Sequence, residues 1–214
     1  MNTAMRRLRP LMLGGTGSDV GKSMLAAGLC RIFRQDGYAP APFKAQNMAL
    51  NSYATPEGFE IGRAQAVQAE AAGIDCHTDM NPLLLKPQGD STCQIVVDGV
   101  AAGTYSSARL YDSEVRAELR GGVCKAFDRL SSRYNPIVME GAGSVAEINL
   151  RESDIVNMPM AAYADAAVLL VADIDRGGVF ASAYGSVMLQ PPEYRRLIKG
   201  IIVNKFRGDM RLFD

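Results

Sequence analysis

The sequence predicts an α/β fold in which a mainly parallel sheet is flanked by helices. Short apolar runs of strand length recur along the chain, and several lack polar alternation, which is typical of strands buried on both faces. The segments between these runs carry helical spacing, and glycines cluster at the ends of the runs. A chain of 214 residues that is 48% hydrophobic is long enough for one domain with a sizeable core.

Gly, Pro or Asn residues bound each predicted strand. The predicted strands are 11–13, 39–43, 94–97, 137–139, 167–171 and 201–203. The first predicted helix begins at Ser23 and ends near Gly37, because glycine can adopt the left-handed conformation that closes a helix. Two long connections, 46–56 and 141–159, follow predicted strands, and α/β proteins usually build their sites on such connections.

The remaining helices follow from spacing and capping residues. They are predicted over 61–72, 112–130, 182–188 and 193–199. Gly73 closes the first of these, and the pair Gly121-Gly122 is a point at which the second could be interrupted. Pro191-Pro192 must break the chain direction between the last two.

The charge balance argues against several classes of partner. Lys and Arg number 23 and Asp and Glu number 23, so no single-sign field exists for nucleic acid or anionic lipid, and neither partner is expected. No apolar run reaches the roughly 18 to 20 residues that span a bilayer, and we expect no signal peptide in the basic start. The 4 cysteines are scattered and only 1 His is present, so no zinc site or disulfide framework is predicted. Reduced thiols suit a cytoplasmic protein, which is the location we expect.

A glycine loop joins the first predicted strand to the first predicted helix. The candidate nucleotide-binding residues in it are Gly17, Ser18, Asp19, Val20, Gly21, Lys22 and Ser23. Backbone N–H groups of such a loop and the positive end of the following helix bind phosphate. We expect Lys22 to reach the β and γ phosphates of ATP, and the Ser23 hydroxyl to bind Mg²⁺. The loop is one residue longer than G-x-x-x-x-G-K-[ST], because Thr16 stands where that pattern has its first glycine.

Acidic residues follow two of the predicted strands, and a lysine follows a third. Glu140 ends a buried strand and is the expected second anchor of Mg²⁺, directly or through water. Asp173 and Asp175, with Arg176, form a polar elbow that is a candidate for holding a substrate, a metal or a partner segment, and the two acids are candidate catalytic residues. The alternative is a structural salt bridge between Asp175 and Arg176. Lys44 is a candidate for bridging a substrate oxygen and the γ phosphate, the alternative being a solvated surface lysine.

An ordered set of motifs resembles the synthetase domain of the cobyric acid synthase family, within the P-loop proteins similar to dethiobiotin synthetase. The motifs are 16–23, 43–48, 60–66, 140–144, 146–150, 173–178 and 204–209. The resemblance runs over 11–214 and implies one ATP-binding P-loop NTPase domain. It implies that Lys44 lies near the γ phosphate, that Asn204 contacts adenine, and that Glu60 is an additional metal ligand.

The resemblance also implies an activity, namely the ATP-dependent amidation of peripheral carboxylates of adenosylcobyrinic acid a,c-diamide in cobalamin synthesis. A carboxylate accepts ammonia poorly, so ATP would first convert it to an acyl phosphate. The implied cofactors are ATP and Mg²⁺, and the implied partners are a corrinoid and a glutamine amidotransferase domain or subunit. Lys44, Arg63 and Arg176 are the local cations expected to meet this polyanionic substrate.

In that family an amidotransferase domain with Cys-His-Glu machinery follows the synthetase domain. This chain ends at Asp214, so we expect a truncated synthetase domain that lacks the amidotransferase. None of its cysteines has the glycine-flanked context of the missing nucleophile.

Two alternative functions stay open, and the oligomeric state is open as well, a homo-oligomer being possible. One alternative function is that of a ligase similar to dethiobiotin synthetase that acts on a small substrate, although the motifs around Asn47, Arg63 and Asp173 argue against it. The other is a nucleotide-dependent switch of the partition ATPase kind, which needs a second lysine early in the loop, where this chain has Gly and Thr.

Overall fold

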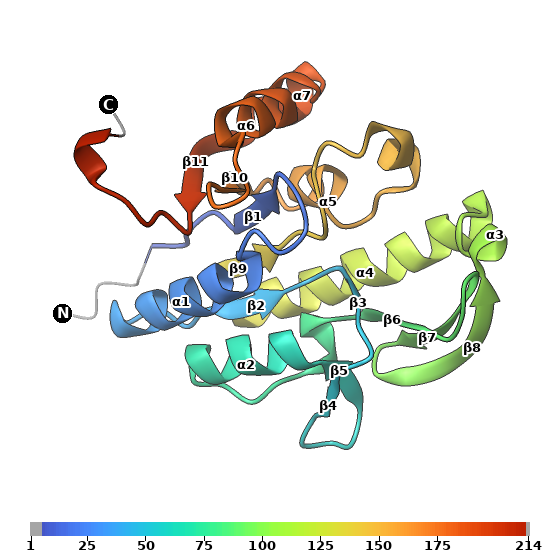
Figure 1. Ribbon diagram of the computed structural model, residues 1–214. Helices are drawn as coiled ribbons and strands as arrows, with labels where there is room; N and C mark the ends of the chain where they lie inside the picture. Colours follow the sequence, from blue (N-terminus) through green and yellow to red (C-terminus); the bar gives the residue numbers. More distant parts are fainter. Residues whose placement is uncertain (1–5, 213–214) are drawn as a thin grey trace.

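A parallel sheet of five strands forms the centre of the computed structural model, which describes residues 6–212 (Figure 1). Its strands are β1 (Leu11–Gly15), β2 (Ala41–Phe43), β9 (Ile137–Glu140), β10 (Ala167–Asp173) and β11 (Ile198–Asn204). They lie in the order β11-β10-β1-β9-β2, and every neighbouring pair is parallel. The carboxyl ends of the strands therefore share one edge of the sheet, where ligands of open α/β sheets bind.

Helices cover both faces of this sheet, as the sequence predicts. They are α1 (Lys22–Gln35), α2 (Arg63–Ala72), α4 (Ser113–Arg133), α5 (Met158–Tyr163) and α6 (Val179–Met188). Leu13 and Val138 pack with α1 and α2, whereas their chain neighbours Met12 and Met139 pack with α4 and α5. Successive strand residues point to opposite faces, so burial on both faces explains why these runs lack polar alternation.

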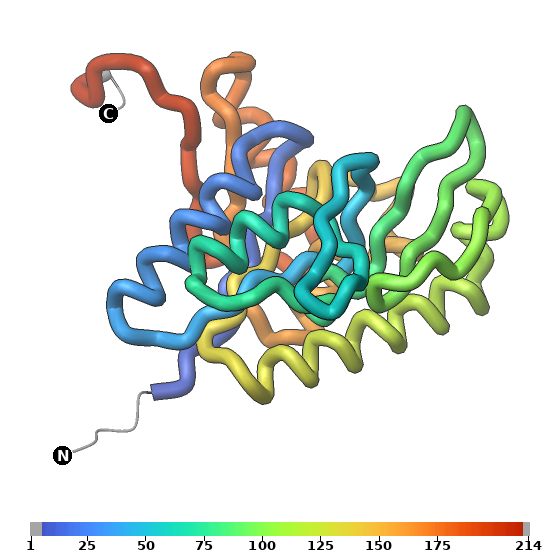
Figure 2. The backbone as a smooth tube through the Cα atoms, turned by 90° about the horizontal axis from the view of Figure 1, so that it is seen from below, coloured from blue at the N-terminus to red at the C-terminus, as the bar shows by residue number. Residues whose placement is uncertain are grey.

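A second sheet lies beside the first and includes strands that the sequence analysis missed. Its strands are β3 (Gln46–Met48), β6 (Leu83–Pro87), β7 (Thr92–Val97) and β8 (Val100–Ser106). The strand predicted at 94–97 exists as β7, but it pairs antiparallel with β6 and β8 and not within the parallel sheet. Figure 2 shows this sheet at the opposite end of the molecule from the last described residues. Two further short strands, β4 (Ser52–Ala54) and β5 (Glu60–Gly62), form a ladder of their own.

The predicted helices are confirmed with two corrections. The helix predicted at 61–72 begins only at Arg63, because Ile61 and Gly62 belong to β5. The helix predicted at 112–130 is α4, which runs without a break through Gly121-Gly122, and 182–188 lies within α6 (Val179–Met188). The helix predicted at 193–199 is wrong in its second half, because α7 (Pro192–Arg195) ends early and Ile198 pairs with Val168 at the start of β11. The short helices not predicted are α3 (Ser107–Leu110), α5, η1 (Thr78–Met80), η2 (Ile148–Ser153) and η3 (Met210–Leu212). The domain limit predicted at Asp214 lies outside the described residues.

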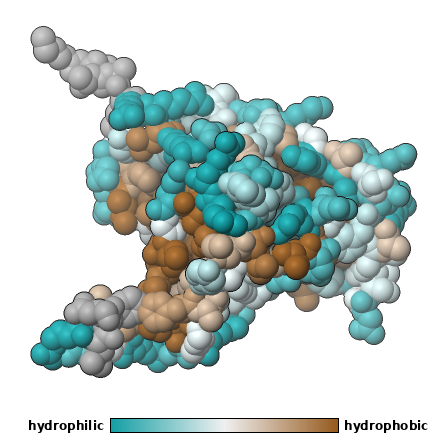
Figure 3. Space-filling view, turned by 90° about the horizontal axis from the view of Figure 1, so that it is seen from above, coloured by the Kyte–Doolittle hydropathy of each residue, from teal (hydrophilic) through white to brown (hydrophobic). Residues whose placement is uncertain are grey.

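The strand β11 is an edge of the main sheet, and apolar side chains gather over β11 and α6 (Figure 3). The exposed ones include Phe180, Leu189 and Ile201. No helix within residues 6–212 has both the length and the apolar character needed to cross a membrane.

The uninterrupted α4 gives a stability prediction. We expect Gly121→Ala to raise the free energy of unfolding by about 0.5–1 kcal/mol, because Ala loses less backbone entropy than Gly in a helix. A Cβ at this position meets no atom within 4 Å. Gly73→Ala is the matched contrast, since Gly73 closes α2 at φ 71° and its Cβ would overlap the Arg34 guanidinium. Urea unfolding measures the free energy of unfolding of both variants, and Gly73→Ala should be destabilised. A Gly121→Ala protein that is less stable than the wild type would contradict the prediction.

Candidate functional site

The glycine loop after β1 wraps tightly around the side chain of Lys22. The loop ends at Gly21, which caps α1 with a φ of 101°, and Asp19 also has a positive φ of 58°. A Cβ on Gly15 would lie 2.5 Å from the Lys22 Nζ and 2.8 Å from the Gly143 oxygen. Only glycine permits so close an approach of backbone and ammonium group.

Lys22 is buried, and its ammonium group contacts only neutral oxygens. Its Nζ donates to the carbonyl oxygens of Gly17 and Gly143, each at 2.8 Å, and these are its hydrogen bonds within residues 6–212. Burial lowers the pKa of Lys22 to about 8, against the opposing effect of the Glu140 carboxylate. A desolvated cation held by carbonyls alone can still form an ion pair, so Lys22 fits the predicted role of binding phosphate.

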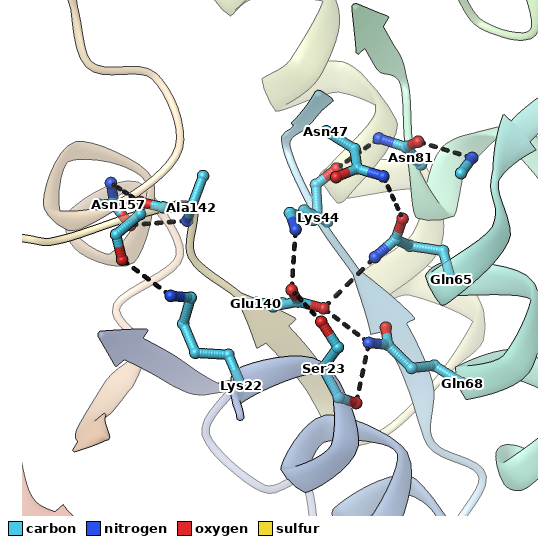
Figure 4. Close-up of polar contacts among 12 residues, drawn as sticks. Lys22, Ser23, Lys44, Asn47, Gln65, Gln68, Asn81, Glu140, Ala142 and Asn157 are labelled. Carbon is cyan, nitrogen blue, oxygen red and sulfur yellow. Dashed lines mark hydrogen bonds and ion pairs between the residues drawn. The ribbon is translucent and has the colours of Figure 1, made fainter. Parts of the chain in front are cut away.

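Glu140, at the end of β9, is the centre of a buried polar cluster (Figure 4). Its Oε1 accepts hydrogen bonds from the Ser23 Oγ and the Lys44 Nζ, each at 2.8 Å. Its Oε2 accepts from the Gln68 Nε2 at 2.7 Å and from the Gln65 Nε2 at 3.4 Å. Glu140 is 2% exposed and Lys44 is 8% exposed, so the two form a buried ion pair. The structure thus brings together three residues that the sequence predicts, namely Ser23, Lys44 and Glu140.

Gln68 leaves one buried oxygen without a hydrogen-bond donor. Its amide nitrogen faces two acceptors, the Glu140 Oε2 and the Ser23 carbonyl oxygen at 3.3 Å. This contact fixes the orientation of the amide, because the reverse would set oxygen against oxygen. The Gln68 Oε1 consequently points away from Glu140, and no donor within the described chain reaches it. Buried acceptors of this kind usually bind ordered water.

The residues around Glu140 suit the predicted Mg²⁺. The described residues contain no group of three or more His, Cys, Asp and Glu side chains that could hold a metal ion by itself. Mg²⁺ is nevertheless commonly bound through one or two protein oxygens together with water and phosphate. The Ser23 hydroxyl and the Glu140 carboxylate supply such oxygens, and the Gln68 Oε1 can accept a hydrogen bond from a water. The residues therefore fit Mg²⁺ that enters with a phosphate ligand.

The structure does not bring Glu60 to this cluster. Its Oε1 accepts a hydrogen bond from the Lys86 Nζ at 2.5 Å, and Glu60 does not line the cavity described below. The resemblance implied a metal ligand at Glu60, whereas the pairing of Glu60 with Lys86 depends on tertiary structure that the local motif does not contain.

The end of β11 ties the glycine loop to the sheet. The Lys205 Nζ donates to the Asp173 Oδ2 at 2.7 Å and to the Asp19 carbonyl oxygen at 2.8 Å. The Asn204 Nδ2 donates to the Val20 carbonyl oxygen, also at 2.8 Å. The Lys205 ammonium holds the pKa of Asp173 below its usual range. Asp173 thus acts on the loop through Lys205.

The rest of the polar elbow forms ion pairs across the surface. Asp175 pairs with Arg207 at 3.5 Å, and Arg176 pairs with Asp173 at 3.5 Å and with Asp19 at 3.8 Å. The structure therefore contains structural salt bridges here, although not the alternative one between Asp175 and Arg176.

A cavity of about 800 Å³ opens beside the glycine loop and Glu140. The predicted residues that line it are Ser18, Asp19, Gly21, Lys22, Ser23, Lys44 and Glu140. The predicted residues that do not line it are Gly17, Val20, Glu60, Asp173, Asp175 and Asn204. The cavity has the size of a small-molecule site and extends from the loop to β3 and the start of α4.

Sequence reasoning missed the amide side chains of the site. Gln65 and Gln68 are three residues apart in a predicted helix, so their common face was a signal already available. Asn157 had no such signal, because it accepts from the Ala142 N–H and donates to the Ala142 carbonyl oxygen only through tertiary folding.

Comparison with known proteins places these features in a family. The model of the CobQ/CobB/MinD/ParA nucleotide binding domain matches residues 11–213. Cobyric acid synthases of Phocaeicola vulgatus, Bacteroides fragilis and Syntrophobacter fumaroxidans are 72%, 70% and 59% identical to the chain. These alignments cover 97–98% of this chain and 40–42% of the relatives, so the chain spans about two fifths of their length. The resemblance expected from the motifs is confirmed.

A solved structure supports the fold. The signal recognition particle receptor FtsY from Elizabethkingia anophelis matches with a TM-score of 0.52 at 15% identity, over 93% of this chain and 51% of that chain. The predicted α/β P-loop fold, with a mainly parallel sheet flanked by helices, is therefore confirmed.

The contact between Lys205 and Asp173 gives a prediction on acid stability. Lys205→Met removes the ammonium group that depresses the pKa of Asp173, so the variant should be less stable than the wild type near neutral pH. A depressed carboxyl pKa contributes stability above its unfolded value and loses it as the pH falls through the folded value. The difference between variant and wild type should therefore shrink below about pH 4.

Urea unfolding at several pH values measures this difference. Lys199→Met is the control, because Lys199 lies on β11, which Lys205 directly follows, and its Nζ donates only to the Arg196 carbonyl oxygen within the described residues. If the free energy of unfolding of Lys205→Met stays below that of the wild type by the same amount down to about pH 3, the ion pair is ruled out as the cause of the difference.

Proposed function

Because the chain belongs to the CobQ/CobB/MinD/ParA nucleotide-binding family, we propose that it is the ATP-dependent amidoligase part of a cobyric acid synthase. Its reaction would be the amidation of peripheral carboxylates of adenosylcobyrinic acid a,c-diamide. The observation that carries the proposal is the arrangement of Lys22, Ser23, Lys44 and Glu140 along one cavity. The identity of 72% to a cobyric acid synthase over nearly the whole chain supports the choice of substrate.

The glycine loop would bind the phosphates of ATP. Its N–H groups and the positive end of α1 suit polyphosphate, and Lys22 would exchange its carbonyl contacts for phosphate oxygens. Ser23 and Glu140 would hold Mg²⁺, which when bound neutralises charge on the transferring phosphoryl group. Asn204 lies beside the loop and is the candidate for contact with adenine.

The proposed chemistry has two displacements. A substrate carboxylate oxygen attacks the γ phosphorus, the bond from that phosphorus to the ADP oxygen breaks, and an acyl phosphate and ADP result. The nitrogen of ammonia then attacks the acyl carbon, phosphate leaves with the electrons of the C–O bond, and the nitrogen loses a proton. Lys44, which lines the cavity beside Glu140, would stabilise charge on the transferring group.

Ammonia would be released from glutamine elsewhere in the whole protein. All four cysteines, Cys30, Cys76, Cys93 and Cys124, lie within the described residues and are free thiols. Burial raises the pKa of each, to about 12 for Cys30. A nucleophilic cysteine needs the opposite shift, so these thiols are unsuited to glutamine hydrolysis. A glutamine amidotransferase domain or subunit is accordingly part of the proposal.

The function is tested by ADP formation from MgATP with the corrinoid diamide and ammonium, which removes the need for glutamine. Lys22→Ala should lose most of the corrinoid-dependent activity, by about two orders of magnitude or more, and remain folded. Lys199→Met is the control for a lysine change outside the cavity. Folded wild-type protein that forms no ADP in response to the corrinoid would overturn the proposal.

The pKa of Lys22 predicts proton uptake on ATP binding. At about pH 8.5 most Lys22 side chains in the free protein are neutral, because their pKa is about 8. Phosphate favours the ammonium form, so binding should take up a fraction of a proton and the affinity for ATP should fall as the pH rises above about 8. Calorimetric titration in buffers of different ionisation enthalpy measures this uptake. In Lys22→Arg, whose guanidinium stays charged, the uptake should disappear.

A further inference from the structure

We propose that Arg116 binds a second carboxylate of the substrate and thereby selects which carboxylate reaches the phosphate end of the cavity. This inference rests on the proposed function, because it concerns the substrate of the same site. Arg116 lies in the first turn of α4 and lines the cavity together with Lys44 and Glu140. Figures 1 and 2 show the start of α4 on the other side of β3 from the glycine loop.

The contacts of Arg116 hold its guanidinium in place without neutralising it. The Nη1 donates to the Gln46 Oε1 at 3.2 Å, and the guanidinium lies over the Tyr111 ring, 5.9 Å from its centroid. Both partners are neutral. Within residues 6–212 Arg116 takes part in none of the ion pairs, and its buried Nε has no hydrogen-bond partner. The side chain is therefore oriented by its neighbours while part of its donor fork stays available.

Such an arrangement is costly unless an anion completes it. Burial lowers the pKa of Arg116, against the opposing effects of Tyr111 and Asp154, so desolvation of the charge outweighs the attraction of these neighbours. A cation in the first turn of a helix also lies at the wrong end of the helix dipole. A carboxylate would satisfy the planar fork through paired hydrogen bonds and remove the uncompensated charge.

Arg116 differs from the other cations that line the cavity. Lys44 pairs with Glu140, and Lys22 lies inside the glycine loop. The Arg151 Nη2 donates to the Leu189 carbonyl oxygen at 2.6 Å, and Arg151 has no buried nitrogen that lacks a partner. The acidic neighbour Asp154 is held by two backbone N–H groups, which donate to its Oδ1. Within the described residues, Arg116 is thus the cavity cation without an ion pair whose buried Nε also lacks a hydrogen-bond acceptor.

Gln46 links Arg116 to the strand that follows Lys44. Gln46 comes two residues after Lys44, so the Cα atoms of the two residues lie at most about 7 Å apart, and both Lys44 and Arg116 line the cavity. One molecule that carries several carboxylates can therefore meet both Lys44 and Arg116. A substrate of this class fits better than one with a single carboxylate.

Two of the cations expected from the sequence to meet the substrate lie elsewhere. Arg63 stacks over the Tyr53 ring at 5.5 Å, and Arg176 pairs with Asp19 and Asp173. Neither lines the cavity. The expectation for Arg63 and Arg176 is corrected, and Arg116 takes their place in the proposal.

The test compares steady-state kinetics of Arg116→Gln and wild type with MgATP, ammonium and the corrinoid diamide. We expect the KM for the corrinoid to rise by about tenfold or more, the KM for ATP to stay within about twofold, and kcat to change little. Arg120→Gln, an exposed arginine one turn further along α4, is the matched control and should behave as wild type. An unchanged KM for the corrinoid in folded Arg116→Gln protein overturns the assignment.

A second measurement uses the wild type and so does not depend on the folding of a variant. Phenylglyoxal labelling of Arg116, read by peptide mass spectrometry, should be slowed by the corrinoid and not by MgATP alone. Labelling that the corrinoid leaves unchanged overturns the assignment of Arg116. Wild-type protein without any corrinoid-dependent ADP formation overturns the proposed function itself, so the two failures are distinguishable.

Discussion

The carboxylate of Glu140 is the constraint on which the rest of the site depends. A charge buried this deeply destabilises a fold unless its lone pairs are used. Here the donors come from the start of α1, from the residue after β2 and from one face of α2. Glu140 lies at the end of β9, next to β1 in the sheet, so its contacts also fix the position of the helix that follows the glycine loop. Satisfying one carboxylate thus aligns four elements around one end of the cavity.

The parts of the molecule that could be predicted are those with local signals. The glycine loop, the strand that ends in Glu140 and the lysine after β2 each follow from a few consecutive residues. Parallel strands place their carboxyl ends at one edge, so the meeting of Ser23, Lys44 and Glu140 follows from the fold class. Apolar runs without polar alternation were sufficient to predict the five strands of the main sheet. A strand that is buried on both faces has apolar residues at every position, and this leaves that pattern in the sequence.

The parts that could not be predicted depend on pairing between distant segments. The strands β3, β4 and β5 are three residues each, too short for a pattern, and β8 is exposed along most of its length. Glu60 matches a motif, yet Lys86 on β6 engages it. The strand that begins at Ile198 continues a helical pattern in the sequence and becomes β11 only because β10 offers it a partner. Arg116 likewise could not be identified as a site residue from the sequence, because the residue that orients it, Gln46, is far away along the chain.

The place of β11 at the edge of the sheet has a mechanical consequence. Its last residue, Asn204, and the next one, Lys205, hold the carbonyl oxygens of Val20 and Asp19. The opposite edge of the same strand pairs with no other strand among the described residues, and apolar side chains surround it. A displacement of β11 would therefore move the two residues that hold the glycine loop. A contact on the exposed edge of this one strand is thus connected directly to the position of the loop.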